Sequence, residues 1–71
     1  MTDRPKLRQG KYAAMTVNER LFVAGLIDQF DVAARKRNRA EMIRILSLVE
    51  LADGAEGIAD SIIENPTRYG Y

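Results

Sequence analysis

The sequence contains no cysteine and no histidine. Without cysteine, neither a disulfide framework nor a zinc–thiolate site can form. Without histidine, the usual general base and the commonest metal ligand are missing. Enzymes that lack both residues generally rely on paired carboxylates in a pocket, and a chain of 71 residues has little core in which to build one. We therefore expect no enzyme, no metal and no cofactor, and nothing in the sequence implies a small-molecule ligand.

Long apolar runs are also missing. The longest run covers residues 21–27, which is far too short to span a bilayer. The first eleven residues are polar and basic, without the apolar stretch of a secretory signal. With 46% apolar and 30% charged residues the composition is that of an ordinary globular protein. These features predict one cytoplasmic domain with no membrane partner.

Helix starts are the strongest local signals in the chain. Three segments fit a capping box, in which the first side chain and a Glu three residues later bond reciprocally to backbone amides: Thr16 with Glu19, Asn38 with Glu41, and Asp53 with Glu56. Each precedes apolar residues at helical spacing. The pattern predicts three helices, which span residues 17–37, 39–51 and 54–64, and the last should stop before Pro66.

The predicted fold is all-α, a compact three-helix bundle. Its domain should span residues 16–65, between a flexible basic arm (1–15) and a short tail (66–71). Residues at helical spacing that should form one buried cluster are Phe22, Leu26, Phe30, Leu46, Val49, Ile58 and Ile62. In the tail, we expect Tyr69 to pack back on the bundle, with Tyr71 exposed.

Charge is divided along the chain. Residues 1–44 hold ten Lys or Arg against five Asp or Glu, and residues 45–71 hold one against five. The net charge of +1 therefore hides a basic half and an acidic half.

The densest basic cluster is Arg35, Lys36, Arg37 and Arg39. Two interpretations fit it. The cluster is a candidate contact patch for phosphate or an acidic protein, with help from Arg4, Lys6, Arg8 and Lys11 of the arm. Alternatively, its cations complement the dipole at the end of the first predicted helix, and the arm is a solubilising tail.

An acidic row is expected on the last helix. Glu56, Asp60 and Glu64 recur every four residues and share one face. They form either a solvated face or a candidate docking face for a basic partner. Phosphate would repel such a helix, which argues against sequence-specific DNA binding through it.

A second apolar stripe is expected on the first helix, away from its core face. Leu21, Gly25 and Val32 lie on this stripe, and a glycine inside a helix suggests that another backbone approaches closely there. The stripe is a candidate partner surface, including for a homodimer. Alternatively, these residues belong to the core, because a central first helix would pack one apolar stripe against each of two neighbouring helices.

Several segments also resemble a set of short uncharacterised bacterial proteins. They are residues 18–22, Gly25-Leu26, Phe30-Asp31 and the ending 65–71, within a likeness that covers most of residues 16–71. The resemblance implies a bacterial origin and no activity.

Taken together, these patterns predict a small non-enzymatic interaction or adaptor module that acts on a protein partner or on its own copy. The alternative is a nucleic-acid-associated protein that makes non-specific phosphate contacts through residues 35–39 and the arm.

Overall fold

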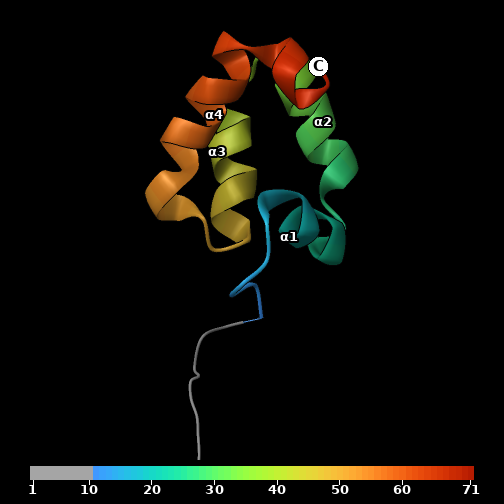
Figure 1. The fold of residues 1–71 in the computed structure, drawn as a ribbon, viewed down its shortest axis with the longest axis vertical. Helices are drawn as coiled ribbons and strands as arrows, with labels where there is room; N and C mark the ends of the chain where they lie inside the picture. Colours follow the sequence, from blue (N-terminus) through green and yellow to red (C-terminus); the bar gives the residue numbers. More distant parts are fainter. Residues whose placement is uncertain (1–10) are drawn as a thin grey trace, which may run out of the picture.

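The computed structural model describes residues 11–71, which form helices and no strand (Figure 1). The elements in chain order are α1 (Val17–Ala24), α2 (Ile27–Arg35), α3 (Arg39–Leu48), the 3-10 helix η2 (Ala52–Gly54), α4 (Ala55–Glu64) and the 3-10 helix η3 (Pro66–Tyr69). The all-α prediction is confirmed. The three-helix bundle is wrong, because the first predicted helix is two helices, α1 and α2.

The break between α1 and α2 occurs at Gly25. This residue has a φ of 73°, in the left-handed region, where a residue with a Cβ is strained. The Gly25 amide donates to the carbonyl of Phe22, and the Leu26 amide donates to that of Leu21 at 2.8 Å. This is the Schellman arrangement that ends helices. An added Cβ at Gly25 would meet no atom of the rest of the chain, beyond its two neighbours, within 4 Å, so no other helix of the described residues approaches it closely.

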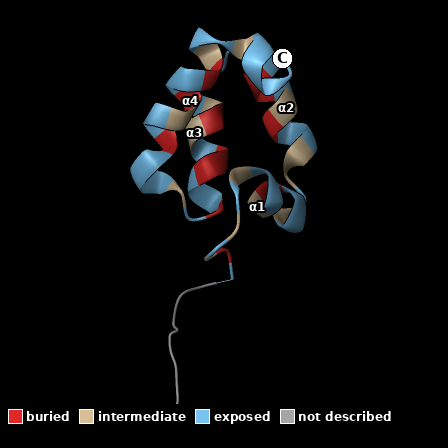
Figure 2. Ribbon diagram, in the orientation of Figure 1, coloured by how far each residue is buried: buried red, intermediate tan, exposed pale blue. Residues whose placement is uncertain are grey.

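The core is centred on α3, which packs against both α2 and α4. Met42, Ile45, Leu46 and Val49 of this segment are fully buried, at the spacing of one wide helical face. In Figure 2 the buried positions of α2, α3 and α4 face the interior, whereas α1 contributes a single buried residue, Leu21.

Most of the predicted core is confirmed. Phe30, Leu46, Val49 and Ile62 are buried, and Leu26 and Ile58 are half-buried against them. Phe22 is the error, because 78% of it is exposed, whereas its neighbour Leu21 is 1% exposed. The break at Gly25 turns α1 relative to α2, so the two helices need not continue a single apolar face.

The three capping predictions have different outcomes. Thr16 and Glu19 form the complete box at the start of α1. Asn38 accepts from the Glu41 amide, but the Glu41 carboxylate binds Arg44 instead of returning to the cap. The third box is wrong, since η2 precedes α4 and α4 has no side-chain cap.

Two predicted helix ends can be compared with the structure. The helix over 54–64 stops before Pro66 as expected. Helix α3 ends at Leu48 rather than at residue 51, because Glu50 takes a left-handed φ of 67° and the Leu51 amide donates back to Leu46.

The last residues of the predicted arm belong to the fold. Tyr12 is buried in the core cluster, and Met15 packs against that cluster. Arg20 of α1 secures this segment, because its guanidinium donates to the carbonyls of Met15 and Val49, each at 3.0 Å. Residues 1–10, with Arg4, Lys6 and Arg8, lie outside the described residues.

Candidate functional site

An exposed apolar surface covers the outer side of α1. Phe22 and Val23, which is 50% exposed, line a shallow hollow of about 430 Å³ together with Met15, Asn18, Glu19 and Ile27. We call these six residues the α1 surface. Within α1, Leu21 is buried in the core and its neighbour Phe22 lies on the exposed side of the helix. Sequence periodicity assigned Phe22 to the core, and the only signal against this was Gly25.

The three residues of the predicted partner stripe do not lie on one surface. Leu21 is buried in the core, Gly25 forms the exposed end of α1, and Val32 lies half-exposed on α2. Val32 instead borders a separate hollow with Asp28, Gln29, Ala33, Lys36, Asn38 and Glu41. The placement of Leu21 on a face apart from the core is wrong, so this stripe offers no common contact surface.

The predicted basic cluster lies at the exposed turn between α2 and α3, and part of its hydrogen-bonding capacity is used within the chain. Arg37 has a left-handed φ of 55°, and its guanidinium donates to the carbonyl of Arg35 at 2.9 Å. The Arg35 guanidinium lies 5.8 Å from the centre of the Tyr71 ring. Lys36 is exposed at the end of α2. These contacts favour the interpretation in which the cluster stabilises the end of α2.

The predicted acidic row is exposed on α4, and its central member is already paired. Asp60 accepts from Nε and Nη2 of Arg39 at 2.6 and 3.3 Å, which joins α4 to the start of α3. The hydrogen bond from Arg39 holds the pKa of Asp60 below its ordinary value. Glu56 and Glu64 are exposed on either side. A basic partner at this face would have to compete with Arg39.

The burial of the two C-terminal tyrosines is the reverse of the prediction. Tyr69 is 46% exposed, whereas Tyr71 is half-buried and its hydroxyl donates to Asp31 of α2 at 2.6 Å. The Tyr71 amide donates to the carbonyl of Pro66, with Gly70 in a left-handed conformation between them. This turn directs Tyr71 back onto α2 and leaves Tyr69 beside α4.

The contact between Tyr71 and Asp31 predicts an alkaline transition. Burial of the ring, and then the hydrogen bond to Asp31, raise the pKa of Tyr71 to about 12 from its ordinary value near 10. Because the neutral phenol is favoured in the fold, its stabilising contribution is complete below about pH 10 and is lost as the pH rises through about 12.

A titration followed by tyrosinate absorbance should therefore show a step near pH 12, and Tyr71→Phe should remove that step. Asp31→Asn should move the same step to lower pH. If the alkaline part of the titration is unchanged in Tyr71→Phe, the ring is not held against α2.

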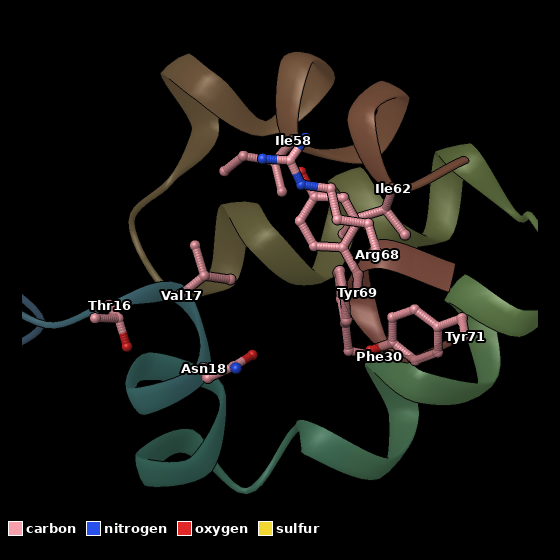
Figure 3. A pocket seen from close by; sticks show the side chains of 9 residues that line it. All are labelled: Thr16, Val17, Asn18, Phe30, Ile58, Ile62, Arg68, Tyr69 and Tyr71. Atoms are coloured by element: carbon pink, nitrogen blue, oxygen red, sulfur yellow. The ribbon is translucent and has the colours of Figure 1, made fainter. Parts of the chain in front are cut away.

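A deeper cavity lies between α1, α2, α4 and the C-terminal segment. It has a volume of about 420 Å³ and is lined by Thr16, Val17, Asn18, Phe30, Ile58, Ile62, Arg68, Tyr69 and Tyr71. Figure 3 shows Arg68 and Tyr69 extending beside Ile58, with Val17 and Asn18 across the same space. No sequence pattern indicated this cavity, since its walls come from four separate segments.

Comparisons with protein-family models, with curated proteins and with solved structures gave no match to this chain. Within residues 11–71, no group of three acidic side chains is placed to hold a metal ion. None of the helices in the described part of the chain has the length and apolar character needed to cross a membrane.

Proposed function

We propose that this protein is a small non-enzymatic interaction module that binds a partner protein through the α1 surface. The observation that carries the proposal is the exposure of Phe22, which lines an apolar hollow and presents 78% of its surface to solvent. Exposed apolar surface of this kind is typical of protein contact sites, and aromatic side chains are frequent anchors in them.

Folding does not require an apolar side chain at position 22. Leu21 supplies the buried contact of α1, and Val17 and Ala24 pack beside it on the same side of the helix. A polar residue in place of Phe22 would leave these contacts intact. Exposed phenylalanine therefore adds little to stability, which supports a role in binding.

The charge around the hollow indicates the chemistry of the partner. Glu19 is the one charged residue in its lining, and the exposed Asp28 follows Ile27 directly. We infer a foreign protein whose apolar side chain packs on Phe22 and whose flanking residues are basic. A two-fold contact with a second copy would bring like charges together at the same place, which disfavours self-association here.

A photo-crosslinking phenylalanine analogue introduced at position 22, in cells that express the full chain, tests this proposal. We expect a discrete adduct with one foreign protein, and no such adduct when the analogue replaces Val32. Against the purified partner, Phe22→Ser should weaken binding by roughly 30-fold, and Asp28→Lys should also weaken it, whereas Val32→Ser should have little effect.

Two results would contradict the proposal. The first is an adduct of the chain with itself, confirmed by a dimeric mass that Phe22→Ser makes monomeric, which would identify the α1 surface as a homodimer contact. The second is equal crosslinking from positions 22 and 32, which would leave the exposed phenylalanine without a specific partner.

A further inference from the structure

We propose that the cavity between α1, α2, α4 and the C-terminal segment binds a single-chain amphiphilic carboxylate, with its apolar chain between α1 and α4 and its carboxylate at Arg68. The chain's sequence implied no small-molecule ligand. Hereafter this space is called the C-terminal cavity. The proposal does not depend on the α1 surface, with which the cavity shares only Asn18.

The walls of the C-terminal cavity are mostly apolar. Val17 of α1, Phe30 of α2, and Ile58 and Ile62 of α4 line it, with the rings of Tyr69 and Tyr71 at the C-terminal side (Figure 3). Its volume of about 420 Å³ falls within the roughly 300–1,000 Å³ that is usual for small-molecule sites. An apolar space of this size favours a ligand with a substantial hydrocarbon part.

A second hollow, of about 480 Å³, lies next to the C-terminal cavity along α4. It shares Val17, Ile58 and Tyr69 with the cavity and is also lined by Gly54, Gly57 and Ser61. At Gly57 an added Cβ would meet no atom within 4 Å beyond its neighbours and the backbone of its own helix, so this side of α4 is open. A linear chain fits such a groove better than a compact ring system does.

The charge of the residues that line the cavity indicates which head group the ligand carries. Arg68 is the one charged residue among the nine that line it. Within residues 11–71 its guanidinium forms no ion pair and donates no hydrogen bond, and only its backbone amide donates, to the carbonyl of Asn65. Its planar guanidinium suits the two oxygens of a carboxylate. The exposed amide of Asn18 lies on the opposite wall as a further donor. A cationic head group would be repelled.

Matched probes test both parts of the ligand. Octanoate, octanol and octylammonium have the same chain and differ in the head, and butanoate shortens the chain. Titrated into the full ¹⁵N-labelled chain, octanoate should bind most tightly and shift amides at Val17, Ile58 and Arg68. Butanoate and octylammonium should bind much more weakly, with octanol in between. Calorimetry supplies the affinities.

Three variants complete the test. Arg68→Gln should weaken octanoate binding roughly tenfold and leave octanol binding unchanged. Val17→Phe should fill the cavity and abolish binding, whereas Val23→Phe, the same change on the α1 surface, should not. Circular dichroism confirms that each variant folds.

The proposal is overturned by any of three results: no octanoate binding at millimolar concentration, shifts confined to the α1 surface, or equal binding of octanoate and octylammonium.

Discussion

Phe30→Ala is expected to lower the free energy of unfolding by about 3–5 kcal/mol, which is a large part of the total stability of so small a domain. Phe30 is 3% exposed, and it lies in the cluster that α2, α3 and α4 share. Removal of its ring leaves a cavity that the short helices around it can close only in part. Urea unfolding followed by circular dichroism measures the loss.

Phe22→Ala is the matched control for this prediction. Because Phe22 is mostly exposed on α1, the same deletion should change stability by no more than about 0.5 kcal/mol. A single helix over residues 17–37 would place both rings in the core, and both variants would then be strongly destabilised. Equal losses would therefore contradict the break at Gly25.

Arg20→Met should lower the free energy of unfolding by about 1.5–3 kcal/mol, the usual cost of losing hydrogen bonds to a charged group. The Arg20 guanidinium joins three segments, since it donates from α1 to the carbonyl of Met15 and to that of Val49 beyond the end of α3. Methionine retains the apolar stem but leaves both carbonyls without this donor. Thermal unfolding measures the difference.

Arg44→Met is the control for Arg20. Arg44 also binds through its guanidinium, at 2.6 Å from Glu41, but this pair is exposed on one turn of α3. Exposed pairs of this kind contribute little, so the loss should stay below about 0.5 kcal/mol. If the two arginine variants lose the same stability, Arg20 does not hold α1 against α3.

The two proposed sites differ in how far apart their residues lie along the chain. The α1 surface depends on a single exposed aromatic side chain whose surroundings are close in the chain, so the sequence contained all of its residues in one stretch of 13, from Met15 to Ile27. The C-terminal cavity joins Val17 to Arg68, which are separated by most of the domain. Sequence periodicity cannot show such a site, because each wall residue taken alone is ordinary core or tail.

Local sequence patterns were enough to predict the helical class, the starts of α1 and α3, the end of α4 before Pro66, and most of the buried cluster. These features depend on local chemistry: the Thr16 and Asn38 caps, the missing amide of proline, and apolar spacing within one helix.

Packing between distant segments settles three further features: Leu21 is buried and Phe22 exposed, Tyr71 rather than Tyr69 is held against α2, and Arg39 pairs with Asp60. The left-handed turns at Gly25 and Gly70 set the direction of the chain that follows, and residues distant in sequence decide which side of each segment meets the core.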